Sequence, residues 1–437
     1  MFKAGLCAVL LASFSLEAGD TRLIEAVKDR NRGSVLSLLA EHVDVNAAQP
    51  DGATPLAWAA YLDEEGLVDI LMKAGARVNT ADEYGETPLT LACANGNASV
   101  IRKLLDAGAN ANAARWDGET ALMIASRSGN AEGVELLLLK GAKVDAIESG
   151  KGQNALMWAA AEGHSAVVGL LLRNGADANF ASKGGFTPVI FAAQNGRTET
   201  VARLLAAHAD VNHAVATGQT ALELALIGAK NEVADILLDH GANINTADSA
   251  GMTPLHAAAQ TGNVKVVGKL LAGGADPNAR TSRIAAGGGG FAAEFFRQPP
   301  GEVTPLHLAA RNNHEDVMRL LVAAGADPKL KGQDGTTLLM SAAASGHIGV
   351  VRYAYELDPD INAANERGST AVHAAVTAFQ SVKEEEIVEV VRFLGTHGAN
   401  LDVKDARGRT PMKIAGILPL DNVIAALAEM TGTSGKH

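Results

Sequence analysis

The chain has 437 residues, and 47% of them are hydrophobic, a fraction that excludes an intrinsically disordered protein. Aromatic residues make up only 4% while glycine occurs 46 times, which favours thin repeated units over one thick core built on rings. The net charge of −12 argues against nucleic-acid binding, and two cysteines exclude both a disulfide framework and a cysteine-rich zinc site.

The first predicted element is a signal peptide at residues 1–18. Lys3 supplies the positive charge, and the apolar run 4–14 after it is too short to span a bilayer. We therefore expect export to a periplasm or beyond, with no membrane span once the signal is removed. The alternative is an apolar N-terminus on a cytoplasmic protein.

From residue 21 onward, one pattern recurs with a period of 33 residues. Each repeat is marked by an anchor residue, which is threonine except for one asparagine. The anchors are Thr21, Thr54, Thr87, Thr120, Asn154, Thr187, Thr220, Thr253, Thr304, Thr337, Thr370 and Thr410. Two steps are longer, at 51 and 40 residues. A period of this length predicts stacked units, because one unit cannot bury its own apolar face.

Each repeat predicts two short helices. The anchor is a helix N-cap residue, and proline often comes next, at the first helical position, where its missing N–H has no cost. A glycine nine residues after the anchor, such as Gly96, ends the first helix. A second apolar-striped helix, such as 99–107, ends at a Gly-Ala pair. The polar residues before the next anchor predict a hairpin.

Segments such as DEYGETPLTLACANGNASVIRKLLDAGANANAA and DSAGMTPLHAAAQTGNVKVVGKLLAGGADPNAR resemble ankyrin repeats. The resemblance implies an α-helical repeat solenoid of paired helices with projecting β-turns or hairpins. It implies about twelve units over residues 19–430, including modified caps, before a disordered tail at 431–437. With the predicted signal, the chain looks like an exported ankyrin protein of the bacterial type.

Two insertions interrupt the period. The first occupies residues 281–298 within a loop at 281–302 and carries Phe291, Phe295 and Phe296. Its glycines lack the lysine and preceding strand that a phosphate-binding loop needs. This loop is either a mobile linker or a segment whose phenylalanines pack over the groove or against a partner. The second insertion, at 377–386, predicts a longer second helix with acidic residues in its first turn.

Four residues replace the expected glycines at helix ends. Asp63 and Ala229 stand at the turn between paired helices, and His208 and Asp358 come after the second helix. Two interpretations remain open: tolerated backbone strain, or a turn displaced by one residue.

Nothing in the sequence predicts catalysis, a metal site or a cofactor, because no known catalytic or phosphate-binding motif occurs. The resemblance implies that His256, His307 and His373 bridge backbone groups of adjacent units. Cys93 is expected to be a buried, inert thiol. The chain is therefore not expected to be an enzyme, and an active site on the 281–302 loop is a remote alternative.

The predicted function is that of a scaffold that binds a partner protein through its concave and hairpin face. The positions that the resemblance assigns to this face are Tyr61, Leu62, Glu83, Tyr84, Glu86, Trp116, Asp117, Arg127, Phe186 and Met252, with Phe291, Phe295 and Phe296 added by the insertion. The alternative is a secreted effector or inhibitor that acts on a protein of another cell.

The exposed aromatics are the expected hot spots, because rings bury much area at little entropic cost. Tyr84 and Trp116 are expected on equivalent sides of successive hairpins. Their acidic neighbours are Glu83, Glu86, Asp117 and Glu119. They predict a partner with an apolar patch and a basic rim. Three further rings, Trp58, Trp158 and Phe191, are expected to pack between repeats.

Overall fold

The computed structural model describes residues 20–283, 301–380 and 382–432. The predicted signal peptide and the insertion residues Phe291, Phe295 and Phe296 lie outside these ranges. Contacts along the chain divide it into two compact units, the first ending at Asp177 and the second beginning at Ala178. We refer to them as unit 1 and unit 2.

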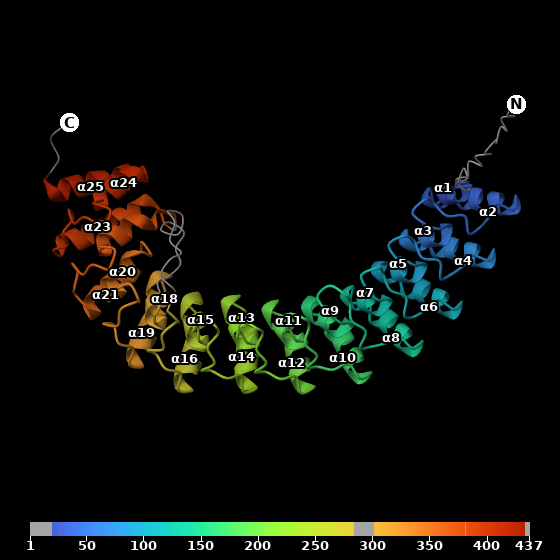
Figure 1. The fold of residues 1–437 in the computed structure, drawn as a ribbon, viewed down its shortest axis with the longest axis horizontal. Coiled ribbons are helices and arrows are strands. Elements are labelled where there is room, and N and C mark those ends of the chain that lie inside the picture. Colours follow the sequence, from blue (N-terminus) through green and yellow to red (C-terminus); the bar gives the residue numbers. More distant parts are fainter. Residues whose placement is uncertain (1–19, 284–300, 381, 433–437) are drawn as a thin grey trace, which may run out of the picture. The chain divides into compact units, whose positions relative to one another are not determined.

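Described residues of unit 1 form five helix pairs (Figure 1). The pairs are α1 (Arg22–Lys28) with α2 (Arg32–Ala40), α3 (Pro55–Tyr61) with α4 (Glu65–Lys73), α5 (Pro88–Asn95) with α6 (Ala98–Asp106), α7 (Ala121–Arg127) with α8 (Ala131–Leu139), and α9 (Ala155–Glu162) with α10 (Ser165–Arg173).

Described residues of unit 2 form seven pairs. They are α11 (Pro188–Gln194) with α12 (Thr198–Ala206), α13 (Ala221–Ile227) with α14 (Asn231–Asp239), α15 (Pro254–Thr261) with α16 (Val264–Ala272), α18 (Pro305–Arg311) with α19 (Glu315–Ala323), α20 (Leu338–Ala343) with α21 (Ile348–Leu357), α22 (Ala371–Val376) with α23 (Glu384–Thr396), and α24 (Pro411–Ile417) with α25 (Asp421–Thr431). The repeat solenoid predicted from the period is confirmed.

Most anchors cap their first helix as expected. Thr54 Oγ1 accepts a hydrogen bond from the Ala57 N–H at 3.2 Å, and Asn154 Oδ1 accepts one from the Met157 N–H at 3.0 Å. The first anchor, Thr21, is different: its backbone is helical and its side chain makes no cap bond. The anchor oxygen thus satisfies an amide that would otherwise be orphaned at a buried helix start.

The four glycine replacements behave in two ways. Asp63, Ala229 and His208 adopt left-handed backbones with φ of 59°, 52° and 62°, so these turns keep the glycine geometry and tolerate its strain. Asp358 has φ of −145° and continues in extended conformation after α21. This turn therefore has a different path, because Pro359 comes next and cannot extend the helix.

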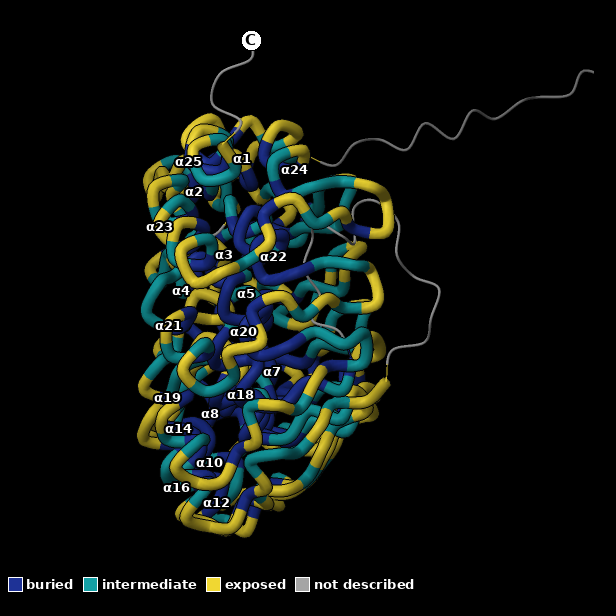
Figure 2. The backbone as a smooth tube through the Cα atoms, turned by 90° about the vertical axis from the view of Figure 1, so that its left-hand side faces the viewer, coloured by how far each residue is buried: buried dark blue, intermediate teal, exposed yellow. Residues whose placement is uncertain are grey.

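Within each unit, first helices pack on first helices and second helices on second helices, so the pairs form two layers. In unit 1 the first layer runs α1, α3, α5, α7 and α9, and the second layer includes α4, α6, α8 and α10. The core lies between the layers and consists of small and aliphatic side chains such as Leu104 and Leu137, both fully buried. Figure 2 shows the buried backbone along the middle of the helices and the exposed backbone at the turns.

An asparagine before each of several anchors ties one repeat to the next. Asn112 Oδ1 accepts from the Lys143 N–H at 2.8 Å, and its Nδ2 donates to the Gly141 carbonyl at 3.1 Å. Asn46, Asn79, Asn179, Asn212, Asn278 and Asn362 make the same two bonds to their following repeats. This asparagine ladder is the backbone reason for the fixed step between repeats.

The histidines three residues after their anchors have a structural role in unit 2. His256 Nδ1 accepts from the Thr253 N–H at 3.2 Å, and Nε2 lies 3.1 Å from the Val303 carbonyl of the next repeat. His373 bridges Thr370 and Arg409 in the same way. For these two residues the expected bridge is confirmed, and Nε2 must carry the proton because the carbonyl can only accept.

The second insertion and the single cysteine of the described chain match their predictions. Helix α23 has 13 residues, and Glu384, Glu385 and Glu386 occupy its first turn. Cys93 is fully buried, and burial raises the pKa of its thiol. In the ranges that the structure covers, no helix is long and apolar enough to cross a bilayer.

Candidate protein-binding surface

The loops that precede the anchors in unit 1 are joined to each other at their tips. The Glu83 N–H donates to the Asp51 carbonyl at 2.8 Å, and the Trp116 N–H donates to the Tyr84 carbonyl at 3.1 Å. Gly85 makes this approach possible, because it has φ of 78° and a Cβ there would lie 2.9 Å from the Trp116 nitrogen. These loop tips form a row held by main-chain bonds.

Three large rings of unit 1 are exposed near this row. Trp116 is 77% exposed, Tyr84 is 56% exposed, and Tyr61, the last residue of α3, is 55% exposed. Tyr84 is the third residue before its anchor and Trp116 the fourth, so the expected equivalence of their positions is wrong by one residue. The bond between their main chains still makes them neighbours across adjacent loops.

The acidic rim expected around these rings is smaller than predicted. Arg115 pairs with Glu86 at 2.5 Å and with Glu119 at 2.6 Å, and both carboxylate side chains are at most 16% exposed. Partial burial acts to lower the pKa of Arg115, but these two carboxylates hold it above its usual value. Glu86 and Glu119 are therefore neutralised within the chain, which leaves Glu83 and Asp117 at the rim.

Arg127, expected to face a partner, is partly occupied within the chain. Its guanidinium lies 4.5 Å from the ring centroid of Trp158 in the next repeat, and 3.6 Å from Glu119. Lys28 lies over Trp58 in the same way at 4.6 Å. Both tryptophans thus make the inter-repeat contacts predicted for them, and each pairs a ring with a cation of the preceding repeat.

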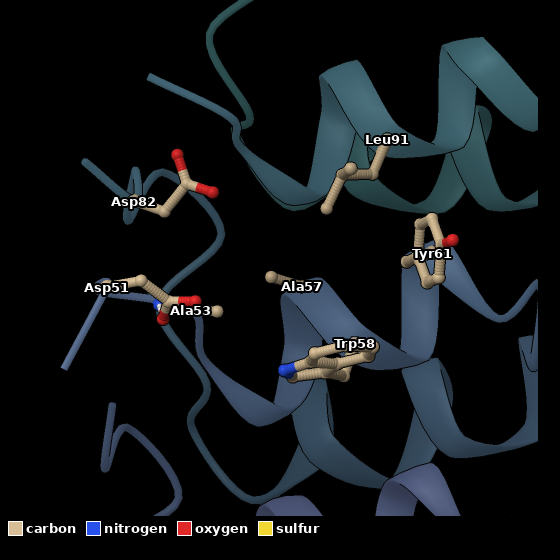
Figure 3. Close-up of a pocket in the computed structure, with 7 residues that line it drawn as sticks. All are labelled: Asp51, Ala53, Ala57, Trp58, Tyr61, Asp82 and Leu91. Carbon is tan, nitrogen blue, oxygen red and sulfur yellow. Dashed lines mark hydrogen bonds between the residues drawn. The ribbon is translucent and has the colours of Figure 1, made fainter. Parts of the chain in front are cut away.

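Sequence analysis did not identify a pocket that unit 1 forms between the repeats of Thr54 and Thr87. It has a volume of about 150 Å³. Figure 3 shows Asp51 and Asp82 on the loop side, with Trp58 and Tyr61 projecting from α3 and Leu91 from α5. The two aspartates are 31 residues apart in sequence, so only the repeat period could have indicated that they meet.

The remaining predicted site residues occupy less exposed positions. Leu62 is half-buried at the end of α3, where the Asn95 amide caps the Tyr61 carbonyl at 2.7 Å. Phe186 and Met252 belong to unit 2 and are half-buried. The Phe186 ring lies 5.4 Å from that of Phe191, a contact within one repeat rather than the predicted packing between repeats.

The described residues contain no group of three or more histidine, cysteine, aspartate or glutamate side chains arranged to hold a metal ion. What unit 1 offers is therefore a rigid surface with exposed rings and a small acidic pocket. Chemically, such a surface can bind apolar and cationic groups.

Comparison with known proteins gives a consistent family assignment. The family model "Ankyrin repeats (3 copies)" matches residues 64–148, 140–215, 192–281 and 306–405. The chain is 34% identical over 116 residues to alpha-latroinsectotoxin-Lt1a of Latrodectus tredecimguttatus, which covers 26% of this chain and 8% of the toxin. It is 33% identical over 125 residues to human B-cell lymphoma 3 protein, which covers 25% of this chain and 24% of that protein.

A third similar protein is the putative palmitoyltransferase ZDHHC13 of Danio rerio, which is 32% identical over 121 residues. That alignment covers 27% of this chain and 18% of the relative. The chain thus matches less than a quarter of the length of each of these three relatives. The likeness concerns the repeats and not the whole proteins.

Proposed function

Because this chain belongs to the ankyrin-repeat family, we propose that it binds a partner protein through the loop tips and first-helix layer of unit 1. Ankyrin-repeat domains generally mediate protein–protein interactions, and their fold is typically a non-enzymatic scaffold. The observation that carries the proposal is Trp116, a ring that is 77% exposed on a loop whose main chain is fixed.

The physical argument is one of preorganisation. A ring on a loop tied to its neighbours loses little conformational entropy on binding, so most of its buried area contributes to affinity. Tyr84 and Trp116 are joined through their main chains and stand exposed, so one partner surface can cover both. A hot-spot ring of this kind contributes about 2 kcal/mol or more, whereas rim contacts contribute little.

The test compares the wild-type chain with the Tyr84→Ala/Trp116→Ala double variant. A protein captured from the native extract by the wild-type chain is purified, and its affinity for both forms is measured by calorimetry. We expect a loss of about 30-fold or more in the double variant. Leu139→Ala is the matched control, because Leu139 is also 77% exposed but lies on α8 in the second layer. Equal affinity of the double variant and the wild type would refute the proposal.

We also propose that the chain is exported. The support is in the sequence: Lys3 precedes a short apolar run and a group of small residues. Mass spectrometry of the native protein is expected to find an N-terminus between about residues 16 and 20. Recovery of the cytoplasmic protein with Met1 intact would contradict this.

A further inference from the structure

The two carboxylates of the unit 1 pocket are held in place and keep one oxygen available. Asp51 Oδ1 accepts from the Ala53 N–H at 3.0 Å, and Asp82 Oδ1 accepts from the N–H groups of Tyr84 and Glu86 at 2.9 and 2.8 Å. Within the part of the chain that the structure describes, neither Oδ2 has a hydrogen bond and neither carboxylate has an ion pair. Both groups are therefore positioned to accept from a ligand.

The charge at this corner is also felt by a neighbouring group. The pKa of the Tyr84 hydroxyl is raised, first by its hydrogen bond with Glu83 and further by the charges of Asp51 and Asp82. The corner thus contrasts with Glu86 and Glu119, whose charges Arg115 neutralises. Excess negative charge favours a cationic ligand.

The opposite side of the pocket is a fixed aromatic wall. The rings of Trp58 and Tyr61 meet edge to face with centroids 5.6 Å apart. The Trp58 indole N–H donates to Gln49 Oε1 at 2.9 Å, which fixes the orientation of the ring. Ala57 and Leu91 supply an apolar floor between the wall and the carboxylates (Figure 3).

Two other steps of unit 1 fill the corresponding positions with a cation and a ring. Lys28 and Arg127, each seven residues after an anchor, lie over Trp58 and Trp158, each four residues after the next anchor. In the step that contains the pocket, these two positions are Tyr61 and Leu91. Here the chain supplies a ring and an aliphatic group but no cation, and a pocket is present.

We propose that this pocket receives an arginine side chain from an extended segment of the partner, an inference that rests on the proposed function. A volume of about 150 Å³ has room for one side chain and not for a folded element. The methylene stem of arginine fits the floor of Ala57 and Leu91. Its planar guanidinium can stack on the rings and donate to both carboxylates, which the point charge of lysine cannot match.

The test uses three blocked tripeptides, acetyl-Gly-X-Gly-amide, in which X is arginine, lysine or the neutral isostere citrulline. They are titrated into the full chain labelled with [15N]tryptophan. The chain has three tryptophans and therefore three indole N–H signals, and the Trp58→Phe variant assigns the relevant one. We expect the arginine peptide to shift the Trp58 signal saturably, with citrulline and lysine at least about tenfold weaker.

The Asp51→Asn/Asp82→Asn variant tests the carboxylates. An asparagine can hold such a loop, because Asn365 Oδ1 accepts two main-chain N–H groups at 3.0 Å at the position equivalent to Asp82. We expect the double variant to keep its melting temperature and lose at least about tenfold in affinity for the arginine peptide. Asp117→Asn is the matched control, because Asp117 has the loop position of Asp51 but does not line the pocket. If the double variant melts early, Asp82→Asn alone replaces it.

Several outcomes overturn the inference. These are no saturable shift of the Trp58 signal, equal binding of citrulline or lysine, or an equal loss of affinity in Asp117→Asn. The peptide titration needs no partner, so it fails independently of the proposed function. Peptide binding together with unchanged partner affinity in the Tyr84→Ala/Trp116→Ala variant would refute the proposed surface and leave the pocket intact.

Discussion

The two units place different chemistry at equivalent positions of one repeat. Unit 1 has exposed rings at its loop tips and beside its pocket, while the third residue after each of its anchors is uncharged, as in Ala57, Thr90 and Met123. In unit 2 that third position holds a buried titratable group in four repeats. These groups are Glu223, His256, His307 and His373. Substitution at a loop tip changes what the repeat can bind, whereas substitution at the third position changes stability and its dependence on pH.

The largest effect is expected from Glu223, which is 1% exposed. Burial raises its pKa from 4.5 to about 8, and the charge of Asp248 adds to the increase. The folded state therefore binds the proton more tightly than the unfolded state, so the free energy of unfolding falls as pH rises from 4.5 to about 8. The expected fall is about 1.4 kcal/mol for each pH unit in this window.

Urea unfolding at pH 5 and pH 8.5 measures this contribution. Glu223→Gln keeps a hydrogen-bond donor and does not titrate, so we expect its stability to fall less than that of the wild type over the same range. Glu83→Gln, at an exposed loop position of unit 1, is the control and is expected to behave like the wild type. The same pH dependence in Glu223→Gln and wild type would contradict the prediction.

The next effect concerns His256, whose replacement by alanine removes the bridge to the Val303 carbonyl and leaves a cavity. We expect a loss of about 3 kcal/mol in the free energy of unfolding. Burial lowers the pKa of His256 to about 4, so this residue also makes the folded state less stable as pH falls from 6.5 to 4. The variant should lose that acid sensitivity, and an unaltered acid transition would speak against it.

The asparagine ladder is common to both units, and its removal should affect them alike. Asn112→Ala in unit 1 and Asn212→Ala in unit 2 each lose two hydrogen bonds to the following repeat. We expect each variant to lose about 1 kcal/mol by chemical denaturation. A difference of more than about 1 kcal/mol between the two would show that the units do not share one stacking mechanism.

The smallest effect on stability is expected at the exposed rings. Tyr84→Ala should change the free energy of unfolding by less than about 0.5 kcal/mol, because its side chain contributes nothing to the core. Thermal unfolding checks this. A larger loss would mean that Tyr84 supports the loop, and the affinity effect of the double variant would then need another explanation.

The repeat period was enough to predict the helix pairs, since an N-cap anchor and a glycine nine residues later are local signals. The period did not give the backbone of Asp358, because the same helix pattern is compatible with an extended exit and with a left-handed one. The exposed rings of Tyr61, Tyr84 and Trp116 were predicted from their places in the repeat. Such a place determines exposure because the fold is periodic.

The pocket and the reduced acidic rim were not predicted, for a common reason. Each depends on which side chains of neighbouring repeats meet across the loop row. Arg115 lies 29 residues from Glu86, and its pairing with that carboxylate cannot be read from either loop alone. Trp58 was assigned to packing between repeats, and it does pack there, yet its ring also lines the pocket.

The row of loop-tip bonds has an evolutionary consequence at the first insertion. The Thr281 N–H donates to the Val303 carbonyl at 3.1 Å, so the chain on both sides of residues 284–300 is joined by one short bond. Ser282 reaches the preceding tip and Gly301 accepts from the following one, each at 2.7 Å. A gene can therefore gain or lose codons between these points while the repeats on either side keep their spacing. This loop is a natural place for the family to acquire new sequence, and for an engineer to graft a peptide.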